Sequence, residues 1–175
     1  MSKLVMSLPL SAAFASTISV SQLAHDVLNI SDSDWSIGFA QGFIWHPHRV
    51  TFLPPANIGG YWVEICTANA PALQLNTTQA VCVPFTIPKS NRIYVSGNSA
   101  KSTTIDLLHG NYHLLFESRK MEAAEASKLH GFEWCSANPA GFAEVIRLTF
   151  LPTKDLPLQQ LPWSLKPQST VSHRL

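Results

Sequence analysis

Two histidines separated by a single residue are the first groups in this sequence that could do chemistry. His46 and His48 flank Pro47, and on one strand their rings would point to the same face, where they could share a metal ion. A metal site needs a third or fourth ligand, and nothing in the sequence singles one out. We therefore favour two histidines at the mouth of a strand whose entry Pro47 shapes. A metal-dependent β-sandwich enzyme or small-molecule binder that uses His46 and His48 is the alternative.

The cysteines are a second possible source of chemistry. Cys66, Cys82 and Cys135 are far apart and odd in number, a pattern that indicates neither a disulfide framework nor a metal knuckle. Cys66 and Cys82 lie inside apolar strand patterns, which favours buried thiols without reactivity. Cys135 lies in a region that the patterns do not place, so a role as nucleophile stays open. No Gly-x-Ser-x-Gly elbow, glycine-rich phosphate loop or His-Glu-x-x-His motif is present, and we expect no enzymatic activity and no cofactor.

Aromatic residues gather next to the histidine pair. Trp35, Phe39 and Phe43 recur at helical spacing, and we expect them to dock a short helix on a sheet. Trp45 and Arg49 are equally compatible with packing and with a partner-binding patch, because Trp and Arg are enriched at the energetic centres of interfaces. The candidate partner-binding residues are Trp45, His46, His48 and Arg49.

The stretch from Gln79 to Ile87 contains the clearest structural pattern in the chain. Its apolar side chains alternate with other residues at Val81, Val83, Phe85 and Ile87. A period of two predicts a strand with one face on a core. Pro84 cannot donate to a strand ladder, so it indicates an edge position or a bulge.

Similar alternating runs on both sides of this stretch predict about eight strands with turn signals between them. Short helices are expected near residues 34–43 and 121–130. A parallel α/β fold would need a helix after nearly every strand, and the sequence does not supply one. We therefore predict a single all-β domain, an antiparallel β-sandwich with one or two short helices.

Composition narrows the classes of function. The chain has 175 residues, of which 46% are hydrophobic and 13% are charged, and this composition excludes a disordered protein. The formal net charge is +1, from 12 basic and 11 acidic residues. A basic surface for nucleic acid is therefore not expected, nor is an acidic surface that imitates a phosphate backbone.

The two ends of the chain differ from its middle. We interpret residues 1–16 as a flexible N-terminal arm and residues 152–175 as a Pro-rich tail. A short signal peptide is the alternative for the N-terminus, but Pro9 and several serines interrupt its apolar run. No stretch approaches the roughly 20 apolar residues that a membrane span needs, and we expect no membrane partner.

Several segments, taken in order, resemble the competence protein J (ComJ) family. Each piece alone is short, but their order and spacing are similar to the family pattern over residues 17–151. The matching pieces are Ser19–Gln22, Trp35, Gln41–Phe43, Trp45, Val50–Phe52, Val83–Phe85, Asp106–Leu107, Gly110–Tyr112, Leu114, Phe116 and Leu148–Phe150. The chain departs from the pattern in its apolar N-terminus, an insert at residues 121–140 and its Pro-rich tail.

The resemblance implies a ComJ-like β-sandwich domain over residues 17–151 in a bacterial, cytoplasmic protein. It implies non-enzymatic binding to a protein partner, most concretely inhibition of a DNA-entry nuclease, without direct binding to nucleic acid. The family supplies no catalytic residues to transfer. Because the net charge is close to zero, such an inhibitor would need shape and aromatic contacts rather than broad mimicry of DNA.

Overall fold

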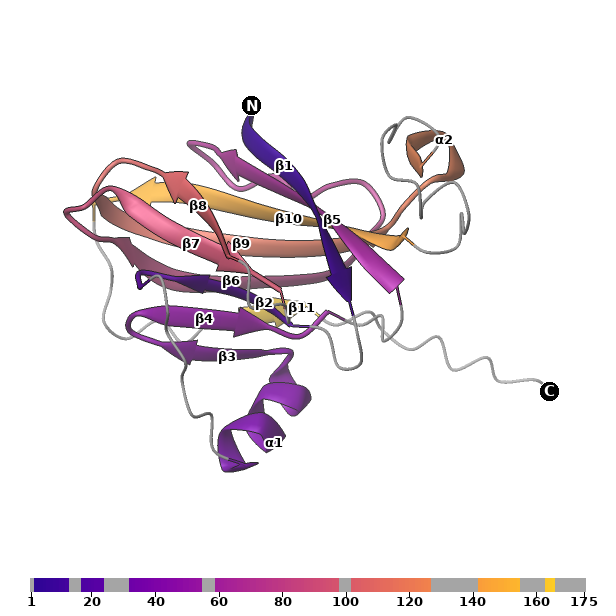
Figure 1. Cartoon of the computed structure of the whole chain (residues 1–175), viewed down its shortest axis with the longest axis horizontal. Helices are drawn as coiled ribbons and strands as arrows, with labels where there is room; N and C mark the ends of the chain where they lie inside the picture. The colour runs from indigo at the N-terminus through magenta and orange to yellow at the C-terminus, as the bar shows by residue number, and fades with distance from the viewer. Residues whose placement is uncertain are drawn as a thin grey trace.

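The computed structural model describes residues 2–12, 17–23, 32–54, 59–97, 102–126, 142–154 and 163–165. Strands dominate these parts of the chain, with two short helices beside them (Figure 1). The elements are β1 (Lys3–Ala12), β2 (Ile18–Ser21), α1 (Asp32–Gln41), β3 (Phe43–His46), β4 (Arg49–Phe52), β5 (Gly59–Thr67), β6 (Thr77–Ile87), β7 (Arg92–Ser96), β8 (Ser102–Asp106), β9 (Gly110–Lys120), α2 (Ala123–Ala126), β10 (Phe142–Thr153) and β11 (Trp163–Leu165). No helix among the described residues is long and apolar enough to cross a membrane.

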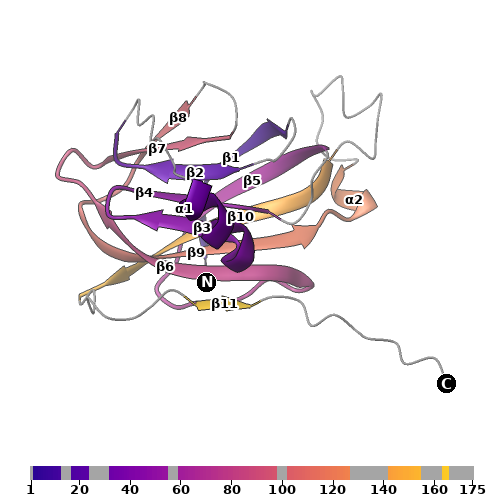
Figure 2. The same cartoon turned by 90° about the horizontal axis from the view of Figure 1, so that it is seen from below.

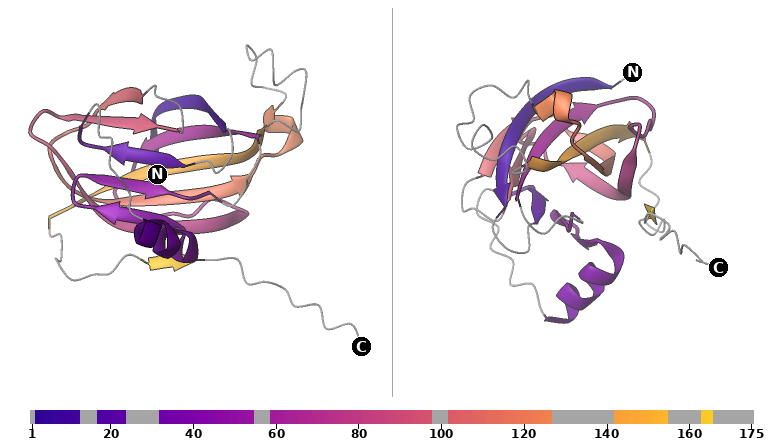
Figure 3. Two further views of the ribbon diagram at one scale, coloured as in Figure 1. Left: turned by 60° about the horizontal axis from the view of Figure 1, so that its bottom comes forward. Right: turned by 90° about the vertical axis from the view of Figure 1, so that its right-hand side faces the viewer.

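The strands form two sheets that pack face to face, which confirms the predicted all-β sandwich (Figure 3). The larger sheet has the order β1-β5-β10-β9-β6-β11, and the smaller has the order β3-β4-β2-β7-β8. Every described strand pair is antiparallel except β5 and β10, which run parallel. β10 comes late in the chain but lies between β5 and β9.

Aromatic rings join the two sheets at the centre of the core. Phe52 of β4 stacks on Phe116 of β9 with a centroid distance of 4.6 Å. Within the larger sheet, Phe85 and Tyr112 meet Phe150 edge to face, at 6.2 and 6.1 Å. Aromatic pairs in these geometries stabilise a core beyond the burial of their area.

The organising strand β6 follows the predicted alternation. Val81, Val83, Phe85 and Ile87 are buried in the core between the sheets. Among the described residues, β11 pairs with β6 only at residues 80–82, so Pro84 has no described ladder partner on its outer side, as predicted for an edge position. The register shift in β6 lies at residues 77–79 rather than at the proline.

Helix α1 confirms the helix expected near residues 34–43, and it lies beside β3 (Figure 2). The side chains of Trp35 and Phe39 lie outside the described residues, so their docking role stays a prediction. Phe43 is buried as the first residue of β3. The second expected helix forms at Ala123–Ala126, and residues 127–130 of that prediction lie outside the described residues.

Three strands were not predicted, namely β1, β3 and β11. Residues 3–12, assigned from the sequence to a flexible arm, form β1 and pair with β5 along their whole length. Pro9 interrupts the apolar pattern but is tolerated because β1 is an edge strand. Residues 163–165, assigned to the tail, pair with β6 (Figure 2). The domain boundaries at residues 17 and 151 stay predictions.

Two glycines fix how α1 meets the sheet. A Cβ at Gly38 would collide with Ile44 and would come within 3.2 Å of Leu53. Gly42 ends the helix with a φ of +90°, and a Cβ there would collide with the Gln79 amide of β6. The left-handed conformation at a helix end favours glycine, so Gly42 allows both the reversal into β3 and the close approach to β6.

The Gly42→Ala variant should be less stable than the wild type by about 1–3 kcal/mol, because alanine is strained at this positive φ and the Gln79 amide must move to admit its Cβ. Urea unfolding measures this change. Ser36→Ala is the matched control, since Ser36 is an exposed residue of the same helix. Equal unfolding free energies for the wild type and Gly42→Ala would contradict this account of the helix end.

Candidate partner-binding surface

The four residues proposed from the sequence lie on one β-hairpin. β3 ends at His46, a short turn contains His48, and β4 begins at Arg49. The register pairs Trp45 with Val50 and His46 with Arg49. Because side chains alternate along a strand, Trp45 lies on the core side of the sheet, whereas His46 and Arg49 lie on its outer face. We call Trp45, His46, His48 and Arg49 the hairpin surface.

Trp45 bridges the two sheets at their open edge. Its side chain is on the core side, but β3 is an edge strand and 40% of the residue remains exposed. The indole Nε1–H donates a hydrogen bond of 2.8 Å to the backbone carbonyl of Pro84 in β6. The ring is therefore both accessible and fixed in orientation, and a fixed aromatic side chain loses little entropy when a partner covers it.

Arg49 lies along the outer face of the smaller sheet. Its Nε donates to Thr51 Oγ1 at 3.2 Å and its Nη2 donates to Ser19 Oγ at 3.0 Å. The two hydroxyl oxygens are 2.9 Å apart and both residues are buried. On the same face, His46 has a buried Nε2 with no hydrogen-bond partner among the described residues. The guanidinium of Arg49 is thus held over β4 and β2 by the hydroxyls beneath it.

His48 is held in place by Gln22, a residue that the sequence analysis did not identify. Gln22, directly after β2, contacts His48 Nδ1 through its Oε1 at 3.1 Å. Its Nε2 donates to the carbonyls of Pro47 at 3.2 Å and Thr86 at 2.9 Å, and its backbone N–H donates to the carbonyl of His48 at 2.9 Å. The pairing of β2 with β4 brings Gln22 to the turn. These two strands are far apart in the sequence, so no local sequence pattern predicts that they pair.

The structure places the two histidines that could have shared a metal ion in different elements. His46 is the last residue of β3, whereas His48 belongs to the turn and bonds to Gln22. The described part of the chain contains no group of three His, Cys, Asp or Glu residues placed to hold a metal. Cys66 is buried, and burial raises the pKa of its thiol, which weakens it as a nucleophile. Cys135 lies outside the described residues.

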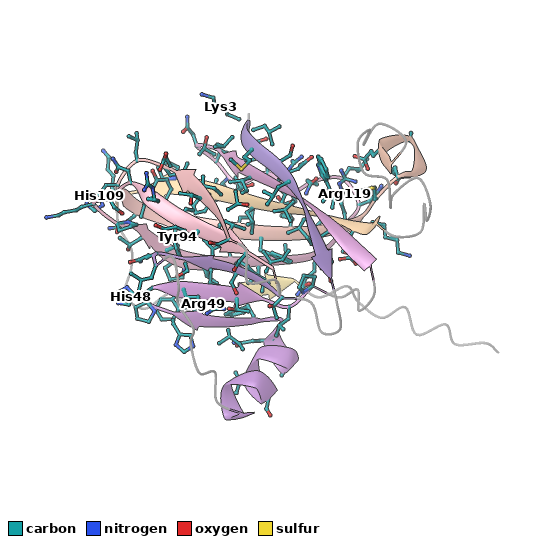
Figure 4. All side chains as sticks on the ribbon, in the orientation of Figure 1. Lys3, His48, Arg49, Tyr94, His109 and Arg119 are labelled. Atoms are coloured by element: carbon teal, nitrogen blue, oxygen red, sulfur yellow. The ribbon has the colours of Figure 1, made fainter. Side chains whose placement is uncertain are left out.

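A second polar cluster, also missed from the sequence, lies on the outer face of the larger sheet, at the end where Arg119 appears in Figure 4. Strand register places Glu64, Arg147 and Glu117 in one row across β5, β10 and β9. Arg147 donates two hydrogen bonds to Glu64 Oε2, at 2.9 and 2.7 Å. Glu117 is fully buried and accepts from the backbone N–H of Gln74 at 2.6 Å and from Thr77 Oγ1 at 3.3 Å.

Two buried carboxyl groups of the larger sheet, those of Glu117 and Glu144, hold protons more tightly than ordinary glutamates. Burial raises the pKa of Glu117, while the Gln74 amide and nearby Arg147 oppose the rise. Burial likewise raises the pKa of Glu144, against the hydrogen bond that Ser118 Oγ donates to it at 2.8 Å. A raised folded-state pKa adds stability at low pH, and this contribution is lost as the pH rises through the folded-state value.

The Glu117→Gln variant should therefore gain stability relative to the wild type as the pH rises from about 5 to about 8, a range above the ordinary glutamate pKa. Glutamine keeps an oxygen for the Gln74 amide but cannot ionise. Chemical unfolding at several pH values measures the difference. Glu122→Gln, at an exposed glutamate of the same end, is the matched control. Parallel pH profiles for the wild type and Glu117→Gln would contradict this interpretation.

Comparison with known proteins gives a family match and two structural likenesses. The family model described as Competence protein J (ComJ) matches residues 15–150. The crystal structure of ComJ from Bacillus subtilis, an inhibitor of the DNA-degrading activity of NucA, superposes with a TM-score of 0.60 at 18% identity, covering 87% of this chain and 99% of that one. The crocagin biosynthetic gene J protein superposes with a TM-score of 0.52 at 19% identity, covering 88% of this chain and 99% of that one.

At these identities, the two likenesses establish a shared fold. Both likenesses span nearly the whole of the other chain. A comparison with curated protein sequences finds no match.

Proposed function

Because the chain belongs to the competence protein J family, we propose that it binds a DNA-degrading nuclease and inhibits it without catalysing a reaction. The family match over residues 15–150 is the observation that carries this proposal. The structural likeness to ComJ from B. subtilis, an inhibitor of NucA, supports the nuclease as the class of partner.

The chemistry of the described residues supports binding rather than catalysis. The Cys66 thiol is buried, His48 bonds to Gln22, and the buried carboxyl groups of Glu117 and Glu144 accept hydrogen bonds from Gln74 and Ser118. None of these groups pairs a nucleophile with a base in the described part of the chain. Cys66 and Cys82 form no disulfide in the part of the chain that the structure describes, which suits the proposed cytoplasmic location.

The hairpin surface is the proposed contact region. Trp45 offers an exposed and oriented aromatic ring, with the turn residue His48 exposed beside it. Arg49 is held in place by two hydroxyls of the outer face. A stable complex of this kind buries about 800 Å² on each partner, with a few aromatic and arginine residues supplying most of the affinity. The inhibitor would then block the nuclease by shape, since its net charge of +1 cannot imitate DNA.

A capture experiment followed by an activity assay tests the function. The tagged full chain is used to capture partners from its native cell, and the captured protein is assayed for degradation of DNA. We expect a nuclease whose activity falls to zero as the chain approaches one equivalent. Capture of proteins without nuclease activity, or a nuclease that stays active at excess inhibitor, would contradict the proposal.

The double variant Trp45→Ala/Arg49→Ala should bind this nuclease more weakly by at least about 2 kcal/mol, because both residues are expected near the centre of the interface. Isothermal titration calorimetry measures the loss. Leu75→Ala is the control, since Leu75 is 85% exposed and lines a pocket with Arg119, which lies at the opposite end from His48 (Figure 4). A folded double variant that binds as tightly as the wild type would remove the hairpin surface from the interface.

A further inference from the structure

We propose that Gln22 is a positioning residue that fixes the hairpin surface for its partner, an inference that rests on the proposed function. Gln22 lies outside the hairpin but contacts both residues of its turn. It bonds to the carbonyl of Pro47 and to the ring and carbonyl of His48. It also bonds to the carbonyl of Thr86 in the opposite sheet. One side chain thus ties the tip of the hairpin to β6.

The surroundings of Gln22 fix the orientation of its amide. Nε2 faces two carbonyl oxygens, those of Thr86 at 2.9 Å and Pro47 at 3.2 Å, and only the NH₂ group can donate to both. Oε1 therefore faces His48 Nδ1 at 3.1 Å. An amide oxygen can only accept, so neutral His48 carries its hydrogen on Nδ1 and keeps Nε2 as an acceptor. The less common tautomer of a histidine is thereby selected.

Trp45 makes a second hydrogen bond to the same edge of β6, beside the one from Gln22. Its acceptor is the carbonyl of Pro84, two positions before Thr86, and carbonyls two residues apart in a strand point to the same side. The pairing of β11 ends at Cys82, so these two side chains cover the carbonyls of β6 beyond it. The hairpin is consequently held at two points, one under the indole and one under the turn.

This geometry specifies what a partner must present. The exposed His48 ring offers Nε2 as a hydrogen-bond acceptor, which requires a donor on the partner, such as a backbone amide or a lysine. The fixed indole of Trp45 requires an apolar pocket beside that donor. Because Gln22 holds the turn in advance, the partner does not bear the cost of ordering it.

Nuclear magnetic resonance on the full chain tests the assignment without any partner. A long-range ¹H–¹⁵N spectrum at a pH where the histidines are neutral should show His48 as the Nδ1–H tautomer in the wild type. In Gln22→Met, which keeps the length of the side chain but removes its polar atoms, the Nε2–H form should become the major one. In Gln22→Met the Trp45 indole hydrogen should also exchange with solvent about fivefold faster than in the wild type. This is the change expected when the attachment of the hairpin to β6 is weakened by the free energy of one hydrogen bond.

Binding then tests the positioning role. Gln22→Met should bind the nuclease from the capture experiment about five- to tenfold more weakly than the wild type, for the loss of one to two fixed contacts. Gln41→Met is the matched control, because Gln41 also donates one side-chain bond, to the carbonyl of Phe43, but does not reach the turn. Unfolding midpoints of both variants verify that each is folded.

The possible outcomes separate the claims. A wild-type His48 in the Nε2–H form overturns the assignment directly and needs no variant. An unchanged tautomer and unchanged indole exchange in Gln22→Met overturn the role of Gln22. If both spectra change while affinity does not, the positioning role is wrong and the proposed function stands. If the wild type shows the expected tautomer but binds no nuclease, the proposed function fails and takes the positioning role with it.

Discussion

Burial of one face of each sheet is the constraint on which the rest of this structure depends. The stacked rings of Phe52 and Phe116 mark the centre of that buried layer, and alternation along β6 places its apolar side chains there. The two sheets, of six and five strands in the described part of the chain, are separate. Each of them therefore has its own edge strands. A sheet edge with free backbone groups invites pairing with other chains, and at β6 this edge is covered by β11, Trp45 and Gln22.

One residue that covers this edge, Trp45, also belongs to the hairpin surface that we propose for recognition. Trp45 remains 40% exposed while its indole N–H bonds to β6, so one side chain completes the sandwich and presents an aromatic surface. Rigid aromatic side chains with satisfied polar atoms suit an inhibitor, because binding need not order them. The near-neutral charge of the chain agrees with this mode of recognition, in which complementary shape replaces an acidic imitation of DNA.

Sequence patterns predicted the fold class and most core strands because the side-chain period of a buried strand is local information. Val81, Val83 and Phe85 illustrate this directly. The short strands β3 and β11 have too few residues to show the two-residue alternation of a strand. In β1, Pro9 interrupts the apolar pattern, so this edge strand was not recognised. The candidate site was found only in part. Trp45 and Arg49 stand out by residue type, whereas the contribution of Gln22 depends on the pairing of β2 with β4 and on the approach of β6, which no window of sequence contains.

The position of β10 has a consequence for how this protein is made. β10 is the last long strand in the described chain, yet it lies between β5 and β9 in the middle of the larger sheet, and its Arg147 bonds to a β5 residue 83 positions earlier. During synthesis, β5 emerges from the ribosome long before β10, the strand that comes to lie between it and β9. Such non-local pairing is slow to form. Until β10 pairs with them, the unpaired edges of β5 and β9 are open to aggregation. A nascent chain stopped before residue 142 would therefore be a substrate for chaperones rather than a smaller stable domain.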